Sequence, residues 1–188
     1  GAWVVSLNED GLPNLAVNDH YREMLNQMRK GDEKNYIADR LRAANWLIKS
    51  VYQRQRTIFR VTECIVKKQQ DFFEKGKRHL KPLVLRAVAE EVELHESTIS
   101  RVTTNKYVHT PRGIFELKYF FSGSVGTSGG DELASESVKT FIRDLIKEEN
   151  PKKPLSDQKI VEILAERGIN LARRTVAKYR EKCKILSS

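Results

Sequence analysis

The sequence has few of the residues that build disulfide or metal frameworks. Only two cysteines, Cys64 and Cys183, occur among its 188 residues, and they lie too far apart to suggest a disulfide framework or a zinc site. The histidines lack the regular spacing of metal ligands; they are His20, His79, His95 and His109. The acidic residues form no nuclease-like cluster. We therefore expect no cofactor, no metal and no enzymatic activity.

Long apolar runs are absent as well. No stretch approaches the roughly 20 apolar residues that a membrane-spanning helix needs, and the chain does not open with a secretory signal. These absences predict a reduced, cytoplasmic setting without membrane contact. The first residue is Gly1 rather than an initiator methionine, so we expect a fragment of a longer protein.

Charge is plentiful and unevenly distributed. Charged residues make up 31% of the chain, and the formal net charge is +9. Residues 121–150 carry 3 basic and 6 acidic groups, a net charge of −3, whereas residues 151–188 carry 10 and 4, a net charge of +6. The positive charge at the C-terminal end favours a polyanionic partner, although a basic tail is often only solvated.

Proline and glycine are both missing from Asp32 to about Glu74. Apolar residues recur there at helical spacing, which predicts one very long helix or two helices with a break near Gln53–Arg56. A shorter helix is expected before it, over 19–30.

The segment from Val84 to Val102 has the apolar pattern of a helix-turn-helix, in which two short helices meet over a tight turn. Its expected core residues are Val88, Ala89, Val92, Leu94, Ile99 and Val102. Glu93 falls where glycine would ease a left-handed backbone, a departure that costs roughly 1–2 kcal/mol. The second helix has two alternative starts, because Ser97 can cap it or His95 and Glu96 can begin it.

The outer face of this second helix carries short polar groups and one arginine, a set that suits contact with base edges better than a protein core. The candidate DNA-binding residues are Glu96, Ser97, Ser100, Arg101, Thr104 and Asn105. A helix-turn-helix used only for protein contacts is the alternative.

The C-terminal residues repeat this outline with more positive charge. Ser156 can cap a helix and Gly168 can end it in a left-handed conformation, and a short connection leads to a basic helix. Arg173 and Arg174 lie at its N-terminal end, the part that enters the major groove in helix-turn-helix proteins, where arginine pairs with guanine. The candidate DNA-binding residues are Arg173, Arg174, Thr175, Ala177, Lys178 and Arg180. A solvated basic helix is the alternative.

The ten residues from Ala172 to Glu181 read ARRTVAKYRE. They match in full the RpoN box, the signature of the sigma-54 family of bacterial transcription initiation factors. The chain also resembles that family over Trp3–Tyr21, His95–Arg101 and Thr110–Ser122.

The resemblance implies two contacts with promoter DNA. The RpoN box would recognise an upstream element containing GG, and the middle helix-turn-helix a downstream element containing GC. It also implies that Trp3–Tyr21 ends a region that binds the RNA polymerase core. An ATP-hydrolysing activator would act on the full-length factor, through an N-terminal region rich in glutamine and leucine.

The expected fold is all-α and has five parts. These are the end of a core-binding region (1–31), a long helix (32–78), a helix-turn-helix domain (79–121), a flexible linker rich in glycine and serine (122–133) and a C-terminal DNA-binding domain (134–188). The expected function is recognition of bipartite promoter DNA. A repressor or recombinase DNA-binding domain is the alternative, and it would require a palindromic site and a dimerisation surface.

Overall fold

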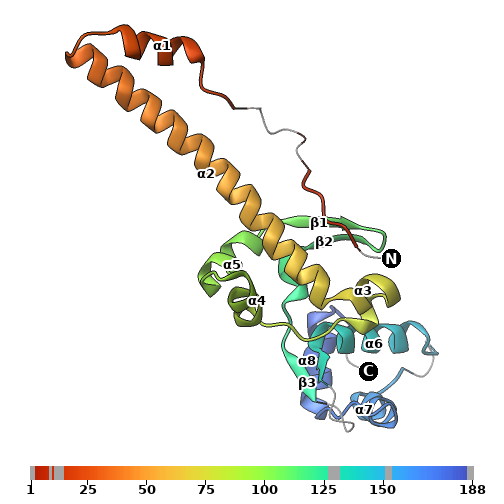
Figure 1. Ribbon diagram of the computed structural model, residues 1–188. Helices are drawn as coiled ribbons and strands as arrows, with labels where there is room; N and C mark the ends of the chain where they lie inside the picture. The colour runs from red at the N-terminus through yellow and green to blue at the C-terminus, as the bar shows by residue number, and fades with distance from the viewer. Residues whose placement is uncertain (1–2, 9, 11–14, 127–131, 151–153, 186–188) are drawn as a thin grey trace. The chain divides into compact units, whose positions relative to one another are not determined.

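The computed structural model describes residues 3–8, 10, 15–126, 132–150 and 154–185. Its elements divide into two compact units, Gly1–Arg60 and Val61–Ser188 (Figure 1). Helix α2 (Asp32–Lys68) contributes residues to both units.

The first unit holds α1 (Asp19–Gln27) and the larger part of α2. Asn18 caps α1, because its side-chain oxygen accepts a hydrogen bond from the backbone N–H of His20 at 2.9 Å. No residue of α1 is buried, and the buried residues of α2 begin at Val61. Helix α2 passes through Gln53–Arg56 without a break, which decides in favour of a single long helix.

The long helix is nevertheless shorter than the predicted range of 32–78. It is followed by a separate short helix, α3 (Gln70–Lys75), and by the 3-10 turn η1 (Lys77–His79). Gln69 lies at the break, and its fully buried side chain binds the backbone of Lys81 twice. Its Nε2 donates to the Lys81 carbonyl at 2.8 Å, and its Oε1 accepts from the Lys81 N–H at 2.9 Å. These bonds hold Lys81 next to the C-terminal end of α2.

Helices α4 (Leu85–Val92) and α5 (Glu96–Thr103) form the predicted pair. Glu93, in the turn between them, has φ 56° and ψ 45°, the left-handed conformation that the sequence predicts. The apolar residues of the pair that are buried are Val88, Ala89, Val92 and Ile99. Leu94 and Val102, which were also expected in the core, are partly buried.

An aromatic cluster packs the segment after α5 against α3. Phe72 of α3 meets the rings of Phe115 and Phe120 edge to face, with ring centroids 5.1 Å apart in both pairs. Phe115 lies in β2 (Gly113–Glu116), and Phe120 ends the 3-10 turn η2 (Leu117–Phe120). Fully burying one such side chain stabilises the fold by about 1.5–3 kcal/mol, so this cluster is a principal support of the region.

The C-terminal elements are β3 (Ser124–Gly126), β4 (Glu132–Ala134), α6 (Ser135–Lys147), α7 (Asp157–Glu166) and α8 (Arg173–Lys182). The three helices share a hydrophobic core. Its buried residues come from all three helices and from the turn before α8; they are Val138, Ile142, Ile160, Leu164, Ile169 and Val176.

Two antiparallel hairpins correct the all-α prediction. β1 (Tyr107–Thr110) pairs with β2, and β3 pairs with β4. A signal for the first hairpin is present in the sequence, because Thr110–Gly113 contains the proline and glycine of a tight turn between two runs rich in β-branched and aromatic residues. The fold is mostly helical, with two small sheets.

The second hairpin occupies most of residues 122–133, the segment predicted to be a flexible linker, and ends at Ala134. Ser124 pairs with Ala134, and Gly126 pairs with Glu132. The physical reason is burial, since Val125 and Leu133 pack against the C-terminal core, a tertiary contact that outweighs the weak strand preference of serine and glycine. The centre of the predicted linker, 127–131, lies outside the described residues.

Burial of Ile99 gives a stability prediction. Ile99→Ala removes methyl groups from a fully buried position and leaves a cavity, so the free energy of unfolding should fall by on the order of 2–5 kcal/mol. Chemical denaturation measures this change. Arg101→Ala, at an exposed position on the same helix, is the control and should change stability by less than about 0.5 kcal/mol. An unchanged unfolding midpoint for Ile99→Ala would contradict the packing of α5.

Candidate nucleic-acid interface

The α4–α5 pair is anchored to the end of α2. Lys68 Nζ lies 2.7 Å from a carboxylate oxygen of Glu91 on α4, and this hydrogen bond holds the pKa of Glu91 below its ordinary value. Cys64, one turn earlier on α2, is buried. Its burial, and secondarily the Glu91 carboxylate beside it, raises the pKa of the thiol to about 11. The thiol therefore stays protonated at neutral pH, and Cys64 acts as a packing residue.

Helix α5 begins at Glu96, directly after His95. The start at His95 and Glu96 is therefore the one found, and the alternative start with Ser97 as the cap is not. The Nδ1 atom of His95 accepts a hydrogen bond from the backbone N–H of Ser97 at 3.2 Å and lies 2.8 Å from the Ser97 hydroxyl oxygen. Glu96 is then the first helical residue, where the helix dipole favours a negative charge. The Ser97 hydroxyl takes part in the cap.

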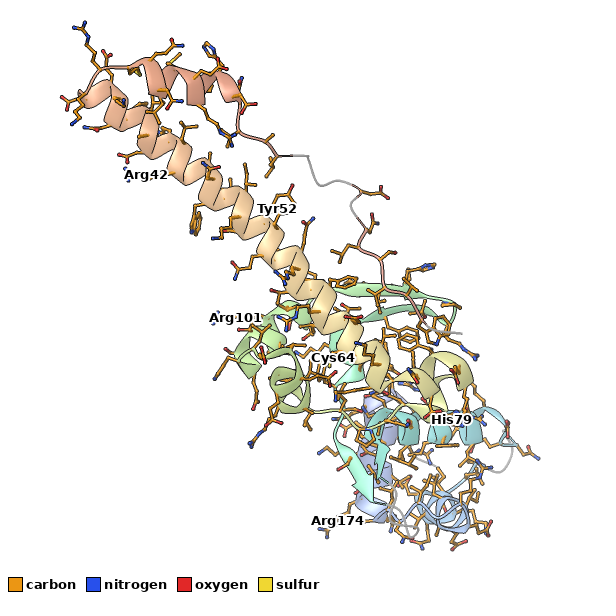
Figure 2. All side chains as sticks on the ribbon, viewed as in Figure 1. Arg42, Tyr52, Cys64, His79, Arg101 and Arg174 are labelled. Atoms are coloured by element: carbon orange, nitrogen blue, oxygen red, sulfur yellow. The ribbon has the colours of Figure 1, made fainter. Side chains whose placement is uncertain are left out.

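The predicted DNA-binding residues of α5 differ in exposure. Those that are exposed are Glu96, Ser97, Arg101 and Asn105, whereas Ser100 and Thr104 are partly buried. Figure 2 shows Arg101 projecting away from its helix. The Thr104 hydroxyl donates to the Ser100 carbonyl at 2.7 Å, so its hydrogen is already used within the protein. Arg101 is therefore the principal long polar group of this face.

The second helix pair has the turn that the sequence predicts. Ser156 caps α7, because its Oγ accepts a hydrogen bond from the Lys159 N–H at 3.2 Å. Gly168 follows α7 with φ 79°, a conformation that glycine adopts without steric cost. Ile169 is then buried against the core, and α8 starts four residues later, at Arg173.

The outer face of α8 presents concentrated positive charge. The predicted residues that are exposed are Arg173, Arg174, Ala177 and Lys178, and Thr175 is partly buried. Arg174 projects outward from the helix (Figure 2). Arg174 and Lys178 are four residues apart and therefore share one side of the helix. Ala177, which precedes Lys178, is exposed as well and has a short side chain.

Arg180 does not belong to this exposed face, which corrects the sequence prediction. Its side chain is 4% exposed and its Nη1 lies 3.2 Å from a carboxylate oxygen of Asp157. The same nitrogen donates to the Leu155 carbonyl at 2.8 Å. Arg180 lies four residues after the buried Val176, on the inner side of α8. Its guanidinium group joins the end of α8 to the start of α7 and is withheld from solvent.

Helix α6 is held against η1 within the second unit. Arg78 donates to the Asp144 carboxylate from Nε at 2.8 Å and from Nη2 at 2.6 Å. The Ser137 hydroxyl donates to the Leu80 carbonyl at 3.0 Å, and both of these residues are buried. An exposed ion pair contributes at most about 1 kcal/mol, so burial of Leu80 and Ser137 is the stronger part of this contact.

Sequence reasoning missed two fully buried polar residues, one at the end of α5 and one at the end of α2. Thr103, at the end of α5, is fully buried and donates from Oγ1 to the Ile99 carbonyl at 2.8 Å. The spacing of four residues from Ile99 was a signal for its inward position. Gln69 had no such signal, because its partner Lys81 lies 12 residues away.

Neither a metal site nor a membrane-spanning helix is found in the part of the chain that the structure describes. No group of three or more His, Cys, Asp or Glu side chains there is placed to hold a metal ion. None of the helices there is both long enough and apolar enough to cross a membrane.

The chain is similar to known proteins over almost its whole length. A family model described as "Sigma-54, DNA binding domain" matches residues 34–188. The RNA polymerase sigma-54 factor of Escherichia coli (strain K12) is 54% identical over 185 residues, which are 98% of this chain and 39% of that protein. The corresponding factor of Azotobacter vinelandii is 49% identical over 186 residues, 99% of this chain and 37% of that protein. The chain thus spans about two fifths of the length of these relatives.

A solved structure is similar as well. It is the crystal structure of Aquifex aeolicus sigmaN bound to promoter DNA, which shares 37% sequence identity with a TM-score of 0.55. The match covers 94% of this chain and 52% of that one.

Two pairs of short helices, each with an exposed polar or basic face on its second member, are typical of helix-turn-helix DNA-binding proteins. The similarity to known proteins identifies which family of DNA-binding proteins this chain belongs to. The chain belongs to the sigma-54 DNA-binding domain family.

The burial of Arg180 predicts a loss of stability rather than a selective loss of DNA affinity. Arg180→Ala leaves the Asp157 carboxylate, which is 15% exposed, without its ion-pair partner, so the free energy of unfolding should fall by about 3 kcal/mol. Thermal or chemical unfolding of the whole chain measures this. Lys178→Ala, exposed on the same helix, is the matched control and should unfold like the unmodified chain. Equal stability of the two variants would mean that Arg180 is not part of the core.

Proposed function

We propose that this chain is the promoter-recognition portion of a sigma-54 transcription initiation factor that serves RNA polymerase. The observation that carries the proposal is the exposure of Arg173 and Arg174 at the start of α8, inside a ten-residue segment that matches the RpoN box. Membership of the family supports it, as does the similarity to a sigmaN that was crystallised with promoter DNA.

Helix α8 is the proposed contact with the upstream element containing GG. An arginine guanidinium group donates two parallel hydrogen bonds to O6 and N7 of guanine in the major groove, which distinguishes guanine from the other bases. Arg173 and Arg174 supply two such groups at the helix end that approaches the groove. Lys178, one turn further along, is placed for a phosphate contact that adds affinity without sequence preference.

Helix α5 is the proposed contact with the downstream element containing GC. Arg101 is its candidate for guanine, and Glu96 can accept a hydrogen bond from the amino group of cytosine. The other exposed groups are Ser97, whose hydroxyl takes part in the cap, and Asn105, which lies beyond the end of the helix. The partly buried Ser100 and Thr104 have a smaller share in this proposed contact.

The remaining partners follow from the family and concern the whole factor. The E. coli and A. vinelandii relatives are named RNA polymerase sigma-54 factors, so we assign the RNA polymerase core as a protein partner. The region 1–31 is the proposed end of the core-binding part, and an ATP-hydrolysing activator is the proposed partner of the full-length factor. The chain acts by binding, not as an enzyme. Family membership disfavours a repressor or recombinase.

Arg173 and Arg174 should determine sequence specificity. Each substitution to alanine should cost about 1–3 kcal/mol on the correct site, because a bidentate contact with guanine is lost. Fluorescence anisotropy on duplexes with the GG element, with that element altered and with random sequence measures the difference.

Lys178→Ala is the control for this specificity test. It should weaken binding to all three duplexes evenly and lower the salt dependence of the logarithm of affinity by about one unit. Equal losses for Arg174→Ala on matched and random DNA would place Arg174 on phosphate, and the proposed guanine contact would then be abandoned.

Binding through two elements should depend on their spacing. An insertion of five base pairs moves one element by about 17 Å and turns it to the opposite face of the duplex. The second contact then forms at a lower effective concentration, so affinity should fall at least about tenfold. A duplex with a changed spacer sequence of unaltered length is the control.

The same experiment tests whether the packing between the two modules limits their reach. Adding about ten glycine and serine residues within 127–131 should not restore the lost affinity, because this segment joins two paired strands that pack on the C-terminal core, and α6 is held to η1 independently of it. Unchanged affinity after the insertion of five base pairs would show that one module alone binds the DNA.

A further inference from the structure

The β1–β2 hairpin has one buried and one exposed face. Successive side chains of a strand point to opposite sides, and Thr110 and Phe115 on one side are 6% and 9% exposed. On the other side, Tyr107 and Ile114 are each 68% exposed, and His109 between them is also exposed. We call Tyr107, His109 and Ile114 the outer hairpin face.

The three residues of the outer hairpin face form one patch. His109 pairs directly with Ile114 in the register of the two strands. Tyr107 lies diagonally across from Ile114, at the distance of about 7–8 Å that long side chains bridge. Glu116 is paired directly with Tyr107 and is partly buried on the same side. The patch is therefore an apolar and aromatic surface with one imidazole ring, bordered by one carboxylate.

The hairpin is fastened at both ends, so its outer face has a defined position. At its base, the Asn105 N–H donates to the Glu116 carboxylate at 2.9 Å and the Leu117 N–H donates to the Lys106 carbonyl at 2.7 Å. At its tip, the guanidinium group of Arg112 donates to the carbonyls of Phe73 and Glu74. A ligand of this face would not have to order the hairpin first.

The hairpin is also close to α5, the helix proposed to contact the downstream element. Three residues separate the end of α5 at Thr103 from Tyr107, so these two positions are at most about 13 Å apart along the chain. The major groove is about 12 Å wide. A helix in that groove therefore places the hairpin within reach of the neighbouring sugar-phosphate backbone and minor groove.

The charge of the hairpin favours a polyanion as the occupant. Residues 106–118 contain three basic groups and one acidic group, a net charge of +2. The acidic group is Glu116, which accepts a hydrogen bond from the Asn105 N–H and keeps its negative charge, so the net charge of the segment stays at +2. Arg112 binds neutral carbonyls, so its positive charge is not cancelled by those contacts.

We propose that the outer hairpin face is an additional DNA-contacting surface, which rests on the backbone and minor groove beside the segment contacted by α5. Tyr107 and Ile114 pack against sugars and base edges, the kind of apolar contact that proteins make in the minor groove. The basic groups at the base and tip draw the hairpin to phosphates. This inference rests on the proposed function, because it assumes that α5 lies on DNA.

The test compares Tyr107→Ala and Ile114→Ala in the whole purified chain, without RNA polymerase. Tyr36→Ala is the matched control, because Tyr36 is 59% exposed and belongs to α2 in the first unit. Affinity is measured by fluorescence anisotropy on a duplex with both elements and on a random duplex. Each hairpin variant should bind both duplexes at least about fivefold more weakly, and the control should bind like the unmodified chain.

Hydroxyl-radical footprinting locates the contact. Protection of one minor-groove window beside the downstream element should disappear in the Tyr107→Ala, Ile114→Ala double variant, while protection at the upstream element remains. Thermal unfolding of the variants should match that of the unmodified chain, because both side chains are exposed.

The outcomes separate this inference from the proposed function. Unchanged DNA affinity of both hairpin variants overturns the inference, and weakened binding to RNA polymerase core in the same variants would identify the face as a protein contact instead. An unmodified chain that binds the two duplexes equally overturns the proposed promoter function. In that case the loss expected for the hairpin variants on random DNA still decides the inference.

Discussion

Helices of eight to ten residues are too short to persist alone in water, and both faces that we assign to DNA lie on such helices, α5 with 8 residues and α8 with 10. Each helix depends on burial of its inner side, where Ile99 and Val176 are completely buried. A partner helix and a tight turn are therefore required at both places. Each helix can present its exposed polar and basic side chains in a fixed arrangement only because its opposite side is packed.

The two turns meet this requirement differently. Gly168 adopts its left-handed conformation without steric cost. Glu93 adopts a similar conformation at a cost of roughly 1–2 kcal/mol, which the surrounding packing must offset. The ion pair between Lys68 and Glu91, together with the buried residues of α4 and α5, supplies that support.

Arginines of one short segment have opposite roles. Arg174 is exposed and projects into solvent, whereas Arg180, six residues later, is buried with Asp157. A buried guanidinium group needs a partner for its charge, and this need ties α8 to α7. Positive charge in the segment therefore serves both the stability of the domain and the surface that we assign to DNA.

Local features of the fold could be predicted from the sequence. The cap at Ser156, the left-handed residues Glu93 and Gly168 and the helical periodicity of α5 and α8 all arise from residues within about four positions of one another. The family resemblance could be recognised in the same way, because the RpoN box is a contiguous segment. These parts of the prediction needed no knowledge of how the chain packs.

Other features were decided by contacts between distant residues. Arg180 binds Leu155 and Asp157, which are 25 and 23 residues away, and Val125 and Leu133 form strands because they pack on a core made by later helices. Gln69 ends the long helix through Lys81, 12 residues further on. The sequence by itself determined the short helices, the cap at Ser156 and the exposed positions of Arg173, Arg174, Ala177 and Lys178. Only the tertiary structure decided which polar groups were removed from the outer faces of these helices, because burial depends on partners that local periodicity does not specify.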